Sequence, residues 1–166
     1  MRAGIALGSN VGDRLENLKA ARKQIGALRL AEEPILASSI YETEPVGCKP
    51  GDPAFLNAAL EIGWLGEPLD LLHELRQIEA NCGRPAAHEK NAPRTLDLDL
   101  LYFGEATIST PELELPHPRV CERRFELEPL AEIRPNLILP GQRQTVAELL
   151  RAVPQTTPLV RIACEW

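Results

Sequence analysis

Two aspartates at alternate positions of a short leucine segment are the residues of this sequence best placed to do chemistry. Residues 96–100 read LDLDL, so in a β-strand the leucines share one face and Asp97 and Asp99 share the other. Two like charges held side by side favour a bound counter-charge, and carboxylate oxygens are ligands that Mg²⁺ prefers, with water and substrate phosphates completing its shell. The plainer interpretation is an amphipathic strand with a solvated acidic face, and the D-x-D pattern taken alone favours it.

Basic side chains gather in two segments that flank these aspartates. The segments 83–94 and 117–124 total 20 residues and hold six of the 18 Lys and Arg side chains. These six are Arg84, Lys90, Arg94, Arg119, Arg123 and Arg124. Arginine grips phosphate oxygens in bidentate fashion, and such arginines beside metal-binding carboxylates are the usual equipment for phosphoryl transfer. Ordinary pairing of surface charges is the alternative, but it stabilises little and explains less of the clustering.

A third set of residues suits a flat ligand. Residues 55–64 alternate between two faces, and Phe55 and Asn57 project from the face opposite the aliphatic set. An aromatic ring beside an amide fits a planar heterocycle with amide-like edges. Phe125 is a second aromatic outside the apolar pattern, although either ring could equally belong to the core. His117, in a two-proline turn, could donate to a phosphate or ribose oxygen or could be a plain turn residue.

Composition and charge limit the class of protein. The 166 residues, 44% apolar and 25% charged, predict one compact domain over residues 1–166. With 24 acidic and 18 basic side chains the net charge is −6, which opposes nonspecific binding to nucleic acid or anionic membranes. Apolar runs fall short of the roughly 20 residues that cross a bilayer, and the N-terminus lacks a signal peptide's apolar stretch, so we expect a cytoplasmic protein. The four cysteines form no CxxC or Cys/His pair and are expected to be reduced thiols.

The elements that would position these residues follow a known order. Apolar runs and turn residues predict strands at 3–7, 35–41, 55–64 and 95–101, with one helix capped by Asp13 and another running from Pro68 to a stop at Gly83. This βαββαβ order predicts an α+β, ferredoxin-like sandwich.

The remaining parts of the chain carry weaker signals. The proline-rich last third predicts a C-terminal decoration of short helices and strands, including one helix opened by a capping box at Thr145 and Glu148. The segment 8–12, GSNVG, lacks the lysine of a Walker motif, so we expect it to have a backbone role and not a phosphate role.

These motifs together resemble one enzyme family. The most specific stretch is KNAPRTLDLDLL at 90–101. Supporting stretches are LGSN at 7–10, YETEPVG at 41–47, FLNA at 55–58, IE at 78–79, GR at 83–84, LPHPR at 115–119 and ERRF at 122–125. From Ile5 to about Pro140 the sequence is similar to the 6-hydroxymethyl-7,8-dihydropterin pyrophosphokinases of folate biosynthesis. The resemblance implies a ferredoxin-like fold and transfer of the β,γ-pyrophosphoryl group of ATP to the hydroxymethyl oxygen of the pterin, with release of AMP.

The resemblance also implies site roles. Asp97 and Asp99 would hold two Mg²⁺ ions, and Arg84 and Arg94 would close over the phosphates as catalytic residues. The implied ATP contacts are His117, Arg123, Glu79 and Leu100. The implied pterin contacts are Phe55 and Phe125 on its two faces and Thr43, Val46 and Asn57 at its edge. ATP and the pterin are the expected partners of a monomer that binds neither nucleic acid nor membrane.

Some positions depart from the family pattern, and two other functions remain open. Asn91 stands where some members carry tryptophan, Ala92 where many carry glycine, and Phe55 where some carry tyrosine. A nucleotidyltransferase with a D-x-D metal site is one alternative, although its two motifs would here be separated by nearly the whole fold. A non-catalytic ferredoxin-like RNA-binding module is the other, and it would need stacking aromatics and positive charge that this chain lacks in quantity.

Overall fold

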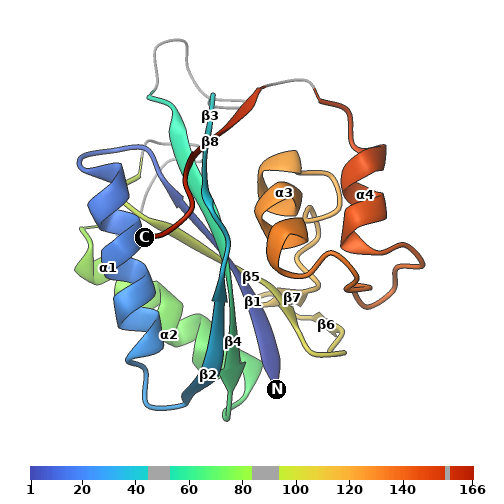
Figure 1. Ribbon diagram of the computed structural model, residues 1–166. Helices are drawn as coiled ribbons and strands as arrows, with labels where there is room; N and C mark the ends of the chain where they lie inside the picture. Colours follow the sequence, from blue (N-terminus) through green and yellow to red (C-terminus); the bar gives the residue numbers. More distant parts are fainter. Residues whose placement is uncertain (45–52, 84–93, 156–157) are drawn as a thin grey trace.

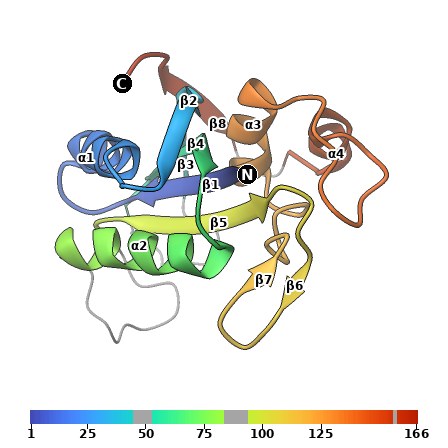
Figure 2. The ribbon, with the colours of Figure 1, turned by 90° about the horizontal axis from the view of Figure 1, so that it is seen from below.

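A central sheet with helices on both sides organises the protein (Figures 1 and 2). The computed structural model describes residues 1–44, 53–83, 94–155 and 158–166. The elements in chain order are β1 (Arg2–Ser9), α1 (Arg14–Gly26), β2 (Ala31–Ala37), β3 (Ile40–Thr43), β4 (Phe55–Trp64), α2 (Pro68–Asn81), β5 (Asp97–Phe103), β6 (Ile108–Ser109), β7 (Glu114–Leu115), α3 (Arg124–Ile133), α4 (Val146–Ala152) and β8 (Leu159–Ala163). The sheet order is β5-β1-β4-β3-β8 with β2 also paired to β4, and all these pairings are antiparallel.

The predicted α+β, ferredoxin-like fold is confirmed, and so are the local signals that begin its helices. The side chain of Asp13 accepts a hydrogen bond from the Glu16 amide at 3.1 Å and caps α1. Pro68 stands in the first turn of α2, where its missing N–H costs nothing. Thr145 and Glu148 form the predicted capping box at the start of α4.

The strand predicted at 35–41 is wrong in detail, because the structure has two strands there. β2 and β3 both pair with β4 and are separated by Ser38 and Ser39. The Ser38 hydroxyl accepts from the Ala59 amide at 2.9 Å, and both the amide and the hydroxyl of Ser39 donate to the Glu132 carboxylate on α3. Side chains thus replace part of the strand ladder at this point.

The last predicted strand is also displaced, since β5 runs from Asp97 to Phe103 instead of 95–101. The carbonyl of Thr95 accepts from the Ser9 hydroxyl at 2.6 Å and from the side-chain Nδ2 of Asn17 at 3.1 Å. Residues before Asp97 are therefore tied to the turn after β1 by side chains, and regular strand pairing begins only at the first aspartate.

Both faces of the sheet are buried against helices, α1 and α2 on one face and α3 and α4 on the other (Figure 1). The alternation in residues 55–64 correctly assigned Leu60 and Ile62 to the core on the α1/α2 face. Ala59 and Glu61, on the opposite face, are fully buried too, because α3 and α4 cover that face. The C-terminal third is thus more than a decoration, and β8 adds a strand to the main sheet beside β3.

The Glu61 carboxylate is buried together with its counter-charges. Its Oε1 accepts from Arg2 Nε at 2.9 Å and from Arg134 Nη1 at 2.8 Å, while Oε2 accepts from the Tyr102 hydroxyl. Arg134 directly follows α3, so its ion pair with Glu61 connects α3 to the sheet.

Candidate active site

The strand register brings the predicted site residues to one face of the sheet. Gly8 in β1 lies opposite Asp97 in β5 on one side and opposite Asn57 in β4 on the other. Directly opposed residues project to the same face of a sheet. Residues two apart along a strand also share a face, so Asp99 and Phe55 join this row. The predicted metal side chains and the predicted planar-ligand side chains therefore lie on one surface, two strands apart.

Gly8 keeps the space between these two groups open. A methyl group on Gly8 would lie 3.5 Å from Asn57 Oδ1 and 3.8 Å from both Asp97 Cβ and Phe55 Cδ1. Since glycine has no side chain, the surface between the amide and the carboxylate stays at backbone level. Reacting groups held on either side can meet there without an intervening side chain.

The amide of Asn57 has a fixed orientation. Its Nδ2 donates to the Thr43 hydroxyl at 2.8 Å, and both side chains are buried. Thr43 lies opposite Phe55 in the β3–β4 pairing, so the three predicted pterin contacts of this region are neighbours. The bond turns Oδ1 toward Gly8, where it can accept a hydrogen bond from a ligand edge.

The turn after β1 holds Arg94 beside Asp97. The Arg94 amide donates to Asn10 Oδ1 at 2.7 Å, and the Asn10 amide donates to the Arg94 carbonyl at 3.1 Å. The Arg94 guanidinium pairs with Asp97 Oδ2 through Nη1. Asn10 thus positions the backbone of a candidate catalytic arginine through its side chain as well as its backbone, whereas the sequence predicts a backbone role alone.

The two aspartates are suitable ligands for Mg²⁺. Their side chains are partly exposed, 21% for Asp97 and 39% for Asp99, and they supply hard carboxylate oxygens on one face. In the described part of the chain no three His, Cys, Asp or Glu side chains gather into a larger cluster. The donor set therefore fits a cation that completes its shell with water and substrate phosphate, as Mg²⁺ does.

Glu79 and Leu100, the other two implied ATP contacts, occupy inner positions. Glu79 on α2 is buried, and its Oε1 accepts at 2.8 Å from the amide of Leu98, the residue between the two aspartates. It thereby ties α2 to the aspartate-bearing strand. The Leu100 side chain packs in the core on the α1/α2 side. Their nucleotide contacts stay predictions.

His117, Arg123 and Phe125 meet around the start of α3. Arg123 Nη1 lies 4.0 Å from Asp99 Oδ2, and the Arg123 guanidinium carbon lies 5.5 Å from the centre of the Phe125 ring. Burial, with further contributions from Arg123 and Arg119, lowers the pKa of His117 to about 4, so the imidazole is neutral at physiological pH. The backbone amide of Arg119 donates to His117 Nδ1 at 3.3 Å, which places the imidazole proton on Nε2.

Sequence reasoning missed one residue of this cluster, Glu126. Its Oε1 accepts from Arg123 Nη1 at 2.5 Å, and its Oε2 lies 3.9 Å from His117 Nδ1. Burial raises the pKa of Glu126 to about 7. The only sequence signal was its spacing of three residues after Arg123, which places the two on one helical face.

Some predicted residues cannot be placed. Arg84 and Val46 lie outside the described residues, as do Lys90, Asn91 and Ala92. Of the predicted thiols, Cys82, Cys121 and Cys164 are unpaired as expected, and Cys48 lies outside the described residues.

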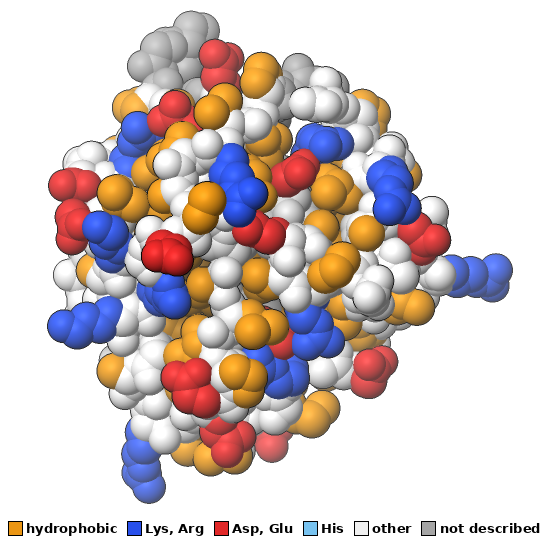
Figure 3. All heavy atoms as spheres, in the orientation of Figure 1, with side chains coloured by type: hydrophobic (Ala, Val, Ile, Leu, Met, Phe, Trp, Pro, Cys, Tyr) orange, Lys and Arg blue, Asp and Glu red, His pale blue; other side chains and the backbone are white. Residues whose placement is uncertain are grey.

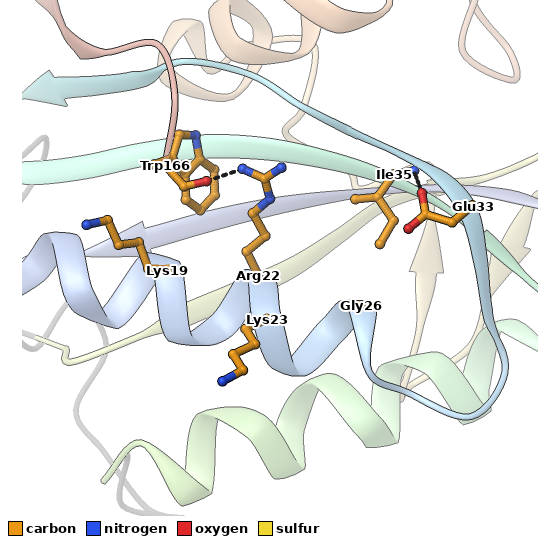
Figure 4. Close-up of a pocket in the computed structure, with 7 residues that line it drawn as sticks. All are labelled: Lys19, Arg22, Lys23, Gly26, Glu33, Ile35 and Trp166. Carbon is orange, nitrogen blue, oxygen red and sulfur yellow. Dashed lines mark hydrogen bonds between the residues drawn. The ribbon is translucent and has the colours of Figure 1, made fainter.

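A hollow elsewhere on the molecule contains none of the predicted site residues. It has a volume of about 480 Å³ and lies over α1 beside Trp166 (Figure 4). It is lined by Lys19, Arg22, Lys23, Gly26, Glu33, Ile35 and Trp166. Trp166 Nε1 donates to the Ser38 carbonyl at 2.7 Å, and Arg22 stacks over the indole with its guanidinium carbon 5.2 Å from the ring centre. These contacts anchor the segment after β8 to the sheet.

Comparisons with known proteins agree with this architecture. A family model described as 7,8-dihydro-6-hydroxymethylpterin-pyrophosphokinase (HPPK) matches residues 4–135. A Bacillus subtilis protein named 2-amino-4-hydroxy-6-hydroxymethyldihydropteridine pyrophosphokinase is 46% identical over 134 residues, which cover 79% of this chain and 77% of that protein. The Pseudomonas aeruginosa protein of the same name is 41% identical over 155 residues, 92% of each chain.

Solved structures show the same fold. The crystal structure of wild-type Plasmodium falciparum HPPK-DHPS with SDX-DHP matches with a TM-score of 0.71 at 14% identity. The match covers 91% of this chain and 44% of that one, so this chain spans less than half the length of the solved protein. The likeness supports the α+β fold alone.

Fold and family match together define an enzyme, and its class is that of the pyrophosphokinases. More particularly, the chain belongs to the 7,8-dihydro-6-hydroxymethylpterin-pyrophosphokinase family.

Proposed function

We propose that this site transfers the β,γ-pyrophosphoryl group of ATP to the hydroxymethyl oxygen of 6-hydroxymethyl-7,8-dihydropterin and releases AMP, a step of folate synthesis. Membership of the HPPK family supports the reaction. The structural observation that carries it is the row formed by Asp97, Gly8 and Asn57 on three adjacent strands. This row sets the side chains suited to metal and phosphate beside those suited to a planar heterocycle.

The nucleotide side of the site would be formed by charged residues. We propose that Asp97 and Asp99 hold two Mg²⁺ ions, which when bound would neutralise the charge of the triphosphate. We propose that Arg94, whose backbone amide donates to Asn10, orients phosphate oxygens, and we assign Arg84 the same task. Glu79 and Leu100 are proposed as further nucleotide contacts.

His117 and Arg123 would complete the phosphate contacts. Because Nδ1 of His117 accepts from a backbone amide, Nε2 carries the proton, and its N–H can donate a hydrogen bond to a phosphate oxygen while the imidazole stays neutral. Arg123 is already oriented by carboxylates on two segments. We assign no general base, since transfer of this kind can depend on positioning and electrostatic stabilisation.

The pterin side would be formed by aromatic and amide groups. We propose that Phe55 and Phe125 contact the two faces of the ring and that Asn57 and Thr43 bind its edge, together with Val46. The rings of Phe55 and Phe125 are each partly exposed, as a surface for stacking must be. The fixed Asn57 amide presents an acceptor beside them.

The remaining expectations are proposals of the same kind. We propose one pyrophosphokinase domain over residues 1–166, acting as a cytoplasmic monomer that binds neither nucleic acid nor membrane. The net charge of −6 supports this, and on the face drawn in Figure 3 basic side chains are interspersed with acidic ones. Among the helices of the described ranges, none has the length and apolar character needed to span a bilayer.

The decisive experiment is a product assay. Purified protein with ATP, Mg²⁺ and 6-hydroxymethyl-7,8-dihydropterin should form AMP, and omission of the pterin should abolish it. Release of pyrophosphate instead of AMP would support a nucleotidyltransferase. Salt-sensitive retention on single-stranded RNA, without pterin-dependent turnover, would support the RNA-binding alternative. Asp97→Ala and Asp99→Ala serve as inactive controls, and parental turnover by either would overturn the metal assignment.

A further inference from the structure

Glu126 is a buried carboxylate to which the transfer proposed above gives no task. Its side chain is 3% exposed, in the first turn of α3. Oε1 accepts from Arg123 Nη1, whereas Oε2 accepts no hydrogen bond from the described residues. Oε2 lies 3.9 Å from His117 Nδ1. The carboxylate is therefore hydrogen-bonded to Arg123 and lies near His117 without bonding it.

Stability alone does not account for a carboxylate at this position. Burial disfavours the ionised form of Glu126, and exchanging a buried ion pair for apolar side chains of similar volume is often neutral or stabilising. Leu127 and Leu130 on the same helix fill the core with such side chains. Packing alone therefore does not explain the carboxylate at position 126, and its pairing with Arg123 must be considered.

The contacts of Arg123 supply that explanation. Its guanidinium lies between Glu126, Asp99 at 4.0 Å and the ring of Phe125 at 5.5 Å. A long arginine side chain loses much rotational freedom when it binds phosphate, and fixing it beforehand lowers that cost. Glu126 is almost fully buried and forms the short hydrogen bond of this set, whereas the Asp99 side chain is 39% exposed.

The second oxygen of the Glu126 carboxylate lies near His117 but forms no hydrogen bond with the described residues. Oε2 approaches His117 from the Nδ1 side, while the proton offered to phosphate sits on Nε2. Glu126 therefore acts on this cluster through its hydrogen bond to Arg123. The charged groups acting on Glu126 are Arg123, Arg119 and Asp99.

We propose that Glu126 is a positioning residue for pyrophosphoryl transfer, which holds Arg123 in the orientation that binds the phosphates of the nucleotide. The inference rests on the proposed function, since it assigns Arg123 to the nucleotide. Glu126 itself touches no reacting group.

The test uses Glu126→Met, which removes the carboxylate at similar length, with Glu126→Gln as the conservative variant. Glu128→Gln is the matched control, because Glu128 lies on the same helix and pairs with Arg124 at 3.0 Å. Glu126→Met should fold, as checked by a cooperative thermal transition, and show a KM for ATP raised by about tenfold, with a smaller change in KM for the pterin. Glu126→Gln keeps an acceptor for Arg123 and should recover part of the loss, while Glu128→Gln should behave as the parent.

The Arg123→Ala protein serves as a second background, which distinguishes a loss of Arg123 positioning from general damage to the site. In Arg123→Ala protein, adding Glu126→Met should change the KM for ATP by less than about twofold, because the group that Glu126 positions is already gone. A parental KM for Glu126→Met, or the same tenfold loss in both backgrounds, would overturn the proposal. If Glu126→Met fails to fold, Glu126→Leu repeats the comparison.

Direct binding keeps this inference distinct from the function. Calorimetry with a non-hydrolysable ATP analogue and Mg²⁺ needs neither pterin nor turnover. A parent that binds the analogue but forms no AMP with the pterin would sink the proposed function, and a weaker affinity of Glu126→Met would still support the positioning role. Equal affinity of parent and Glu126→Met would contradict it.

Discussion

Replacing Gly8 by alanine separates the stability of the sheet from the openness of the site. Gly8 lies in the middle of three paired strands, and its added methyl group would make only ordinary van der Waals contacts, at 3.5 Å from Asn57 Oδ1 and 3.8 Å from Asp97 Cβ. Glycine within a strand costs about 0.5–1 kcal/mol relative to alanine. We therefore expect the free energy of unfolding of Gly8→Ala to stay the same or to rise by about 0.5 kcal/mol.

The same methyl group should obstruct the bound substrates. It would stand between the amide that we propose binds the pterin and the aspartate that we propose binds the metal. Forcing a methyl group into a packed interface costs about 1–3 kcal/mol, and each 1.4 kcal/mol is a factor of ten. We expect kcat/KM for the pterin to fall by about 5- to 150-fold on this basis, while the affinity for an ATP analogue in the absence of pterin changes by less than about threefold.

The assay measures AMP release against pterin concentration, with urea unfolding of the same preparations. Gly8→Val should lose more activity than Gly8→Ala, since a larger side chain fills more of the gap. Parental turnover by a folded Gly8→Ala protein would refute the reasoning, because it would mean that the reacting groups do not meet over this glycine. If Gly8→Ala lost stability as well as activity, the added methyl group would be strained within the sheet, contrary to the contacts given above.

Three further predictions follow from the site and the core. Removal of divalent cations with a chelator should abolish pterin-dependent AMP release, and added Mg²⁺ should restore it; activity that survives chelation would contradict the role of Asp97 and Asp99. Burial raises the pKa of Glu126 to about 7, whereas the unfolded chain releases this proton near pH 4.5. The free energy of unfolding should therefore fall by up to about 3 kcal/mol as the pH rises from about 4.5 to about 7. The melting temperature of Glu126→Gln should depend less on pH than that of the parent protein. An identical pH dependence would show that Glu126 is not the titrating group. Glu61→Ala leaves Arg2 and Arg134 without their buried partner and should lower the free energy of unfolding in urea by about 3–5 kcal/mol. The turnover of the remaining folded protein should be unchanged. A loss below about 1 kcal/mol would show that these ion pairs do not stabilise the packing of α3 on the sheet.

Local patterns predicted much of the fold and of the row of site residues. The alternation of leucine and aspartate at 96–100 correctly placed Asp97 and Asp99 on one face, because strand geometry alone decides which side chains share a face. The same rule placed Phe55 and Asn57 together. Their proximity to the aspartates depended on β1 lying between β4 and β5, which the predicted βαββαβ order implies.

Features that depend on distant residues escaped prediction. The break between β2 and β3 is stabilised by Ser39 bonds to Glu132, which lies 93 residues further along the chain. The inward orientation of Glu126 follows from how α3 packs on β4, and a glutamate in a polar segment gives no sign of burial. Single-sequence patterns report local geometry, whereas these features are set by tertiary packing.

The separation of the two halves of the site is itself fixed by the sheet. Neighbouring strands lie about 4.8 Å apart, so Asp97 and Asn57, with Gly8 between them, stand about 10 Å apart along the direction of the hydrogen bonds. A strand ladder holds this spacing far more rigidly than two loops could. Local hydrogen bonds likewise hold Arg94 at the turn of Asn10 and Arg123 at the start of α3. Backbone pairing therefore sets the distance between the proposed metal ligands and the proposed pterin contact, while local hydrogen bonds orient the arginines proposed to bind phosphate.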